Sequence, residues 1–279
     1  MTAIKDINPD GTKVKNGTLT VEVSLPVVPY TQPDDKTCGE TAVLSMFNGF
    51  IGPDVSNPVR EWSKKNAFKS TGYGTEAYGL GLLIYDILKD RKFYGKRVDV
   101  YANYNYSDYI TGLERRGENV EMESLSKRVL DSMKGGGEGI GIHNGEGIDY
   151  NGILSKVRDG SYAIVNINYH WVLAYGVAKV YEDGKFKREI LLFVNPAPNS
   201  GTVILSQQPS NEEVQKFISF NEKLTDMVDT PDREALAEAF RKGIVSQSEL
   251  SNLEKGKFSA VVVSPENLSE YLKHHHSPV

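Results

Sequence analysis

The chain contains a single cysteine, Cys38, at the point where a loop is predicted to become a helix. The turn-forming run 33–35 precedes it, and apolar residues with helical spacing follow it. Unpaired backbone N–H groups and the positive end of a helix dipole favour a thiolate at such a position, and the thiolate is the form that attacks a carbonyl carbon. A lone cysteine is also commonly a small buried hydrophobe, so the position alone leaves both interpretations open.

Three other side chains could complete a nucleophilic site around this cysteine. Gln32 precedes Cys38 by six positions (38 − 32), enough for a loop to aim its carboxamide at the carbonyl oxygen that the Cys38 N–H also reaches. Two such donors form an oxyanion hole. His170 opens a strand-like run and Asn195 follows the next one. A histidine can serve as a base, and an asparagine can fix the orientation of its ring.

A second histidine, His143, competes with His170 for the role of base. It lies in the stretch 135–152, where eight of eighteen residues are glycine. This composition predicts a loose loop, either a mobile lid beside the site or an ordinary flexible insertion. A base must stay within hydrogen-bonding reach of sulfur, and a strand holds it there better than a glycine-rich loop does. His170 is therefore the preferred base.

Composition and charge argue against several classes of function. The 279 residues carry a formal net charge of −5 without a compensating basic cluster, which argues against a nucleic-acid partner. A single cysteine forms no internal disulfide. The longest apolar runs are too short to span a bilayer, and residues 1–23 lack the pattern of a cleaved secretory signal. We expect a chain without a membrane segment that is cytoplasmic, or is exported without a cleaved signal peptide.

Periodicity predicts a hairpin around Asn16-Gly17, a helix after Cys38, and three antiparallel strands at 161–167, 170–181 and 186–194. The last two strands are joined by Glu182-Asp183-Gly184-Lys185, whose composition is typical of a hairpin turn. Since a hairpin brings the start of one strand beside the end of the next, His170 and Asn195 are expected to be neighbours.

The pattern changes beyond residue 205. Helices are predicted at 211–228, 231–242 and 246–254, followed by one strand at 258–263. We therefore expect a catalytic domain, 1–205, and a mainly helical C-terminal extension, 206–279, that packs on the core, covers the site or binds a partner. Consecutive histidines, His274–His276, are typical of a tag remnant or a disordered end. Neither a cofactor nor a metal ion is expected.

Several short segments, in this order, resemble the bacteriocin-processing peptidases that remove double-glycine leaders, and their stand-alone relatives: Gln32, Cys38-Gly39, Gly74-Thr75, His170-Trp171-Val172 and Asn195-Pro196. Papain-like enzymes place histidine and asparagine about 130–150 residues after the cysteine. Here the separations are 132 (170 − 38) and 157 (195 − 38). The resemblance covers roughly residues 27–205.

The resemblance implies an α+β, papain-like fold, in which an N-terminal helix carrying the cysteine packs on an antiparallel sheet carrying the histidine and the asparagine. Cys38 would then be the nucleophile, His170 the general base and later the acid, Asn195 the orienting residue, and Gln32 the oxyanion donor. The chain departs from the family at Glu40, where proline is common, and at Asn195, where many members have aspartate. The papain signature after the cysteine is also absent, so the substrate class of the family is not inherited. No exporter or ATPase domain follows, and a role in bacteriocin export is therefore not expected.

The leading hypothesis is a cysteine-dependent hydrolase that cleaves a peptide or amide bond of a protein or peptide through a thioester. A bacterial effector delivered into another cell is one context that fits. The same residues serve a glutamine deamidase or a transglutaminase-like acyl transferase. A third reading is an inactive binding module in which Cys38 is only packed. The sequence leaves these alternatives open.

Overall fold

The computed structural model describes residues 12–14, 17–34, 37–52, 59, 61, 69–70, 74–92, 96–115, 131, 139–167, 169–198, 202, 210–229, 233–242 and 247–265. Its elements, in chain order, are β1 (Thr12–Val14), β2 (Gly17–Ser24), α1 (Cys38–Phe50), β3 (Lys69–Ser70), β4 (Gly74–Thr75), α3 (Ala77–Asp90), β5 (Lys96–Ala102), α4 (Tyr106–Arg115), β6 (Ile140–Asn144), α6 (Tyr150–Arg158), β7 (Tyr162–Ile167), β8 (His170–Glu182), β9 (Lys185–Val194), α7 (Asn211–Asp229), α8 (Arg233–Arg241), α9 (Gln247–Glu254) and β10 (Ala260–Pro265).

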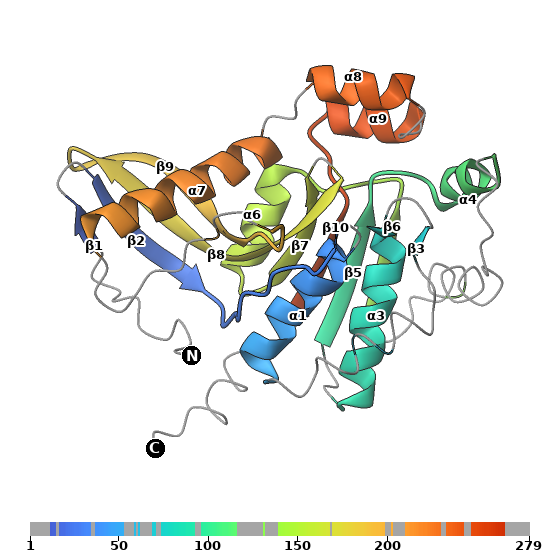
Figure 1. Ribbon diagram of the computed structural model, residues 1–279, viewed down its shortest axis with the longest axis horizontal. Helices are drawn as coiled ribbons and strands as arrows, with labels where there is room; N and C mark the ends of the chain where they lie inside the picture. The colour runs from blue at the N-terminus through green and yellow to red at the C-terminus, as the bar shows by residue number, and fades with distance from the viewer. Residues whose placement is uncertain are drawn as a thin grey trace.

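A mixed sheet lies at the centre of the described structure, with helices packed against it (Figure 1). The strand order is β1-β2-β8-β7-β10-β5-β6, and β9 pairs with β8. All described pairs in this sheet are antiparallel except β5 with β6. The fold is therefore α+β, as the sequence predicts.

The long strand β8 joins two halves of this sheet. It pairs with β7 over residues 170–174 and with β2 over 176–182, while β9 pairs with it over 173–182. Because β9 overlaps both ranges, β7 and β2 must share the opposite edge of β8. Gly176 stands where the partner changes, and a Cβ atom there would lie 2.4 Å from the Val23 carbonyl oxygen. Only glycine allows this close approach.

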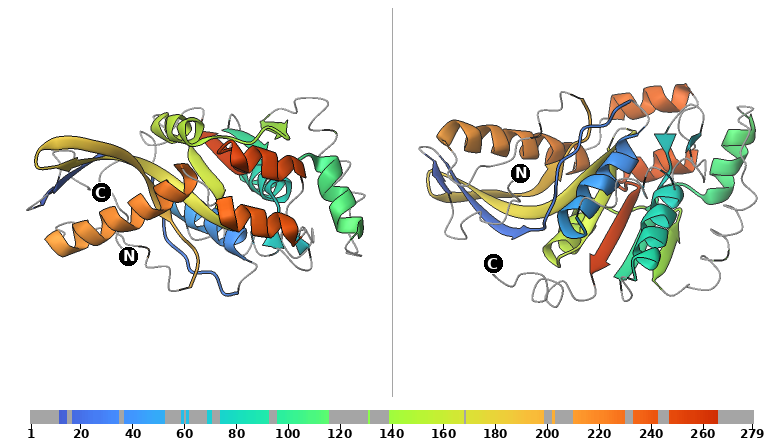
Figure 2. Two further views of the ribbon diagram at one scale, coloured as in Figure 1. Left: turned by 90° about the horizontal axis from the view of Figure 1, so that it is seen from above. Right: turned by 60° about the horizontal axis from the view of Figure 1, so that its bottom comes forward.

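Alternate residues of the central strands bury their side chains on opposite faces of the sheet. Trp171, Leu173 and Tyr175 of β8 join the core formed with α1 and α3. Val172 and Ala174, between them, join the core formed with α6 and the helices of the C-terminal part. In the view from above, α1 and α6 lie on opposite sides of the strands (Figure 2, left). The helix that carries Cys38 is thus one of the layers covering the sheet.

The segment predicted as a C-terminal extension supplies a strand to the middle of the sheet. The helices α7, α8 and α9 form close to their predicted positions, and β10 follows them. β10 pairs with β7 on one side and with β5 on the other. The described part of residues 206–279 therefore contributes a strand to the sheet built from residues 1–205, because β10 lies between two strands of that range.

Helix α7 covers the outer edge of β9. The buried Asn221 side chain, 0% exposed, accepts a hydrogen bond from the Phe193 N–H at 2.7 Å and donates one to the Phe217 carbonyl at 2.8 Å. The Thr225 hydroxyl accepts from the Leu191 N–H at 3.1 Å. Polar side chains of a helix thus replace the neighbouring strand that β9 lacks on this side, and backbone donors that would otherwise be buried without partners are satisfied.

The glycine-rich stretch is ordered where the structure describes it, which corrects the prediction of a loose loop. Ile140–Asn144 forms strand β6, and α6 begins at Tyr150 after Asp149, whose side chain accepts the Gly152 N–H at 2.7 Å. Pairing with β5 satisfies the backbone of β6. Gly141 allows the Asp99 carboxylate of β5 to lie over it, since a Cβ there would be 2.6 Å from Asp99 Oδ1.

Among the described helices, none combines the length and apolar character needed to cross a bilayer. Residues His274–His276 lie outside the described residues.

Candidate functional site

Cys38 is the first residue of α1, as its sequence context predicts, and it is 5% exposed. Thr37, directly before it, makes no side-chain cap on the helix; its hydroxyl donates to the Asp34 carbonyl at 3.2 Å instead. The sulfur lies against the backbone N–H of Trp171, the residue that follows His170. The Trp171 ring also packs against the start of α1, because a Cβ at Gly39 would lie 3.2 Å from its Cδ1. Cys38 and the first residues of β8 therefore meet.

His170 and Asn195, 25 positions apart, are joined by a hydrogen bond of 2.7 Å between Nε2 and Oδ1. The Asn195 oxygen also accepts the Ala197 N–H at 3.0 Å. An atom that accepts from a backbone N–H is the carbonyl oxygen of the amide, so Nε2 of the imidazole must be the donor. In the neutral ring the proton is then on Nε2, and Nδ1 keeps the lone pair that can take a proton.

Thr202 fixes the backbone of Asn195 on both sides. Its hydroxyl donates to the Asn195 carbonyl at 2.9 Å and accepts the Asn195 N–H at 3.2 Å. Asn195 follows β9 directly and lies outside the pairing with β8. The two hydrogen bonds with Thr202 therefore hold its backbone in place of strand pairing. Sequence reasoning missed Thr202. A hydroxyl residue a few positions after the asparagine was the available signal, and it is a weak one.

Gln32 lies next to the asparagine loop. Its backbone N–H donates to the Pro196 carbonyl at 2.8 Å, and its side chain is buried, with the residue 6% exposed. The carboxamide Nε2 donates to the Asp34 carbonyl at 2.8 Å, the same oxygen that Thr37 reaches. The Gln32 carboxamide is thus two hydrogen bonds away from the residue that precedes Cys38.

Burial sets the protonation of the two central groups. It raises the pKa of the Cys38 thiol above its ordinary value, and the backbone N–H groups of Trp171 and Gly39 oppose this rise without cancelling it, while Glu40 adds to it. Burial also lowers the pKa of His170, and the hydrogen bond that the ring donates to Asn195 opposes this shift without cancelling it. The helix terminus alone predicted a thiolate. The pKa of the thiol is instead raised, because the desolvation of the sulfur outweighs the effect of the nearby N–H groups. Both shifts favour the uncharged forms of the thiol and the imidazole at neutral pH.

His143 is not part of this group. It lies on β6, where its ring stacks on Tyr101 at 4.3 Å and its Nε2 is 3.4 Å from Asp99 Oδ1. Four strand spacings, about 19 Å, separate β6 from β8. The structure therefore brings Gln32, Cys38, His170 and Asn195 to one region and leaves His143 at the far edge of the sheet.

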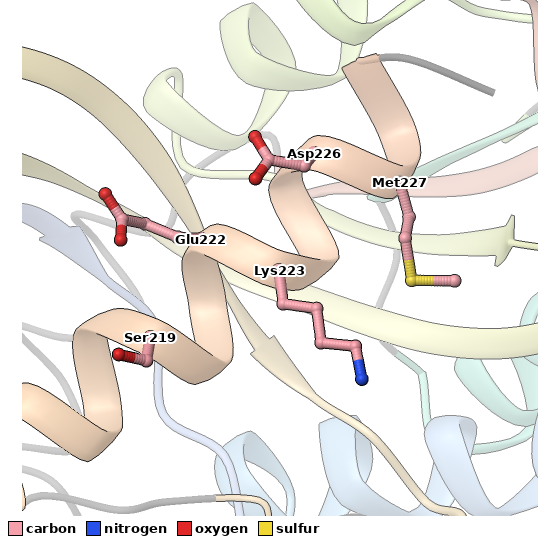
Figure 3. A pocket seen from close by; sticks show the side chains of 5 residues that line it. All are labelled: Ser219, Glu222, Lys223, Asp226 and Met227. Carbon is pink, nitrogen blue, oxygen red and sulfur yellow. The ribbon is translucent and has the colours of Figure 1, made fainter. Parts of the chain in front are cut away.

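A surface hollow of about 510 Å³ lies elsewhere, along α7, and Ser219, Glu222, Lys223, Asp226 and Met227 line it (Figure 3). It includes none of the four predicted site residues. Within the described ranges, no three histidine, cysteine, aspartate or glutamate side chains gather in a way that could hold a metal ion.

The fold and this group of side chains define a class: an α+β protein with a cysteine at a helix start beside a histidine–asparagine pair on a β-hairpin. No protein-family model, no curated protein and no solved structure matches the chain. The assignment of a function therefore rests on the chemistry of the site.

Proposed function

We propose that this protein is a cysteine-dependent hydrolase that cleaves a peptide or amide bond of a protein or peptide through a thioester intermediate. The observation that carries the proposal is the placement of the Cys38 sulfur against the Trp171 N–H, while the ring of the preceding residue, His170, is held by Asn195 at 2.7 Å. A papain-like arrangement, similar to that of the leader peptidases, is supported by a cysteine helix packed on an antiparallel hairpin that carries the other two residues.

In the first half of the reaction, the sulfur of Cys38 attacks the substrate carbonyl carbon while His170 Nδ1 takes the thiol proton. The carbonyl oxygen becomes an oxyanion, which the Gln32 carboxamide and the Cys38 backbone N–H stabilise. The C–N bond then breaks. The leaving amine receives the proton from the His170 imidazolium, and the acyl group remains on sulfur as a thioester.

In the second half, His170 Nδ1 takes a proton from a water molecule whose oxygen attacks the thioester carbon. The C–S bond breaks, the sulfur recovers the proton from the imidazolium, and a carboxylic acid leaves. Asn195 keeps the ring oriented in both halves. A neutral imidazole is the form needed for each proton abstraction, so the lowered pKa of His170 fits a general-base role.

One specific observation favours an alternative, an inactive binding module. The sulfur is almost fully buried, and the pKa of the thiol is raised, both of which are typical of a structural cysteine. The hydrolase differs from this alternative in its need for His170, since a packed cysteine requires no base.

The experiment is mass spectrometry of candidate proteins and peptides incubated with wild type, Cys38→Ala, His170→Ala and His143→Ala. We expect Cys38→Ala to abolish product formation and His170→Ala to slow it by roughly 10²–10⁴-fold, the usual contribution of a general base. His143→Ala is the matched control, a histidine about 19 Å away in strand spacings, and should leave the rate unchanged. Products formed equally by wild type and Cys38→Ala would remove the assignment.

A further inference from the structure

The Gln32 carboxamide has one half that is paired and one that is not. Nε2 donates to the Asp34 carbonyl. The oxygen, Oε1, is buried and has no hydrogen-bond partner among the described residues. Since Nε2 faces a carbonyl oxygen, the amide orientation is fixed by that contact, and Oε1 cannot be the atom that points there. The unpaired atom is therefore an acceptor.

A buried acceptor without a donor costs about 1–3 kcal/mol, so its presence needs an explanation. Gln32 belongs to the candidate site on independent grounds: its backbone is bonded to Pro196, next to Asn195, and its side chain shares the Asp34 oxygen with Thr37, next to Cys38. A substrate bound at this site would supply the missing donor. That substrate must offer an N–H to Oε1 as well as an oxygen to Nε2.

The two halves of a carboxamide lie side by side and point the same way, N–H beside C=O. A primary carboxamide presents the matching pair, C=O beside N–H, and can form both hydrogen bonds at once. Within one peptide unit of a polypeptide the N–H and C=O are trans and point in opposite directions, so a single peptide unit satisfies only one of the two Gln32 atoms. A primary carboxamide satisfies both atoms with one planar group.

We propose that the acyl donor of this site is a primary carboxamide, the side chain of a glutamine or asparagine in a protein or peptide, with Gln32 as the residue that selects it. This deepens the proposed function and rests on it. In the acylation step, the Cys38 sulfur bonds to the side-chain carbonyl carbon, the C–N bond breaks, and ammonia leaves with the proton from His170. Water then converts the thioester to a carboxylate and restores the thiol, so the net reaction is a deamidation.

The test uses Cys38 as a reporter, because it is the only sulfhydryl in the chain. Iodoacetamide is a primary amide, whereas N,N-dimethyliodoacetamide lacks both N–H groups. The ratio of their alkylation rates at Cys38, divided by the same ratio for glutathione, removes the intrinsic reactivity of the reagents and of the thiol. One added hydrogen bond predicts a corrected ratio of about fivefold or more in favour of iodoacetamide.

Gln32→Leu should bring the corrected ratio to about one, while Gln215→Leu, at an exposed glutamine of α7, should leave it as in wild type. A ratio near one in the wild-type protein overturns the inference, and this measurement needs no variant and no known substrate. Circular dichroism of both variants shows whether the fold is kept.

The reaction products of wild type and Cys38→Ala distinguish a failure of this inference from a failure of the proposed function. Conversion of glutamine to glutamate with release of ammonia, lost in Cys38→Ala, supports both. Cut chains that are lost in Cys38→Ala keep the hydrolase and overturn the choice of primary amides. Identical products with wild type and Cys38→Ala overturn both.

Discussion

Nε2 of His170 donates to Oδ1 of Asn195 at 2.7 Å, and this contact determines which ring nitrogen is free to act as a base. We predict that the ¹⁵N signals of His170 at neutral pH show the tautomer protonated on Nε2, and that Asn195→Ala yields a mixture of tautomers. The variant should also slow Cys38-dependent turnover, by roughly 10–100-fold, since the ring loses its orientation but remains a base. A wild-type tautomer protonated on Nδ1 would contradict the site as described.

Stability should depend on pH through His170. Burial lowers its pKa below the ordinary value of about 6.5, which the unfolded chain retains. Between these two values the unfolded state binds more protons, so the free energy of unfolding falls as the pH decreases below about 6.5. We expect urea unfolding to show that wild type loses more stability between pH 7 and pH 5 than His170→Gln does. Equal losses in the two proteins would contradict a buried, neutral imidazole.

The reactivity of the thiol provides a second pH test. Since burial raises the pKa of Cys38, the native protein should be alkylated by iodoacetamide more slowly at pH 8 than the same chain unfolded in guanidinium chloride. The rate should keep rising with pH beyond the point where the unfolded chain levels off. Intact mass reports the reaction cleanly because the chain holds one cysteine. Faster alkylation of the native form at pH 6 would instead indicate a preformed ion pair.

The two hydrogen bonds from Thr202 to the backbone of Asn195 predict a positioning role for the hydroxyl. We expect Thr202→Val to reduce turnover roughly fivefold, the effect of about 1 kcal/mol, while Thr202→Ser keeps the hydroxyl and nearly the full rate. The ¹⁵N signals of His170 should shift toward the mixed tautomers of Asn195→Ala in the valine variant alone. An unchanged tautomer in Thr202→Val would limit Thr202 to a structural role.

Helix α7 should contribute to stability through polar contacts. Asn221→Leu leaves the Phe193 N–H buried without its acceptor, so the free energy of unfolding should fall by about 2 kcal/mol or more. Thr225→Val removes the acceptor of the Leu191 N–H and should cost about 1 kcal/mol, whereas Thr225→Ser retains it. Denaturant titrations measure these differences. A loss in Thr225→Ser equal to that in Thr225→Val would assign the effect to packing instead.

Local sequence patterns were enough to predict most of the described elements and to single out the residues of the candidate site. Alternating apolar residues and the short polar turn predict β8 and β9 as a hairpin, which alone brings His170 beside Asn195. Helical spacing after the loop predicts that α1 begins at Cys38. These features depend on residues close together in the chain, whose periodicity reflects one face of a helix or strand.

Only the tertiary structure decided which elements are neighbours and how deeply they are buried. The period of a strand shows which residues share a face but not which strand lies alongside, so neither the central place of β10 nor the strand β6 within a glycine-rich stretch could be predicted. The Trp171 N–H at the sulfur depends on how α1 packs on β8, and so does the direction of the thiol pKa. The sequence by itself determined which groups could react; long-range packing decided their distances, because burial and strand pairing join parts of the chain that carry no local signal of one another.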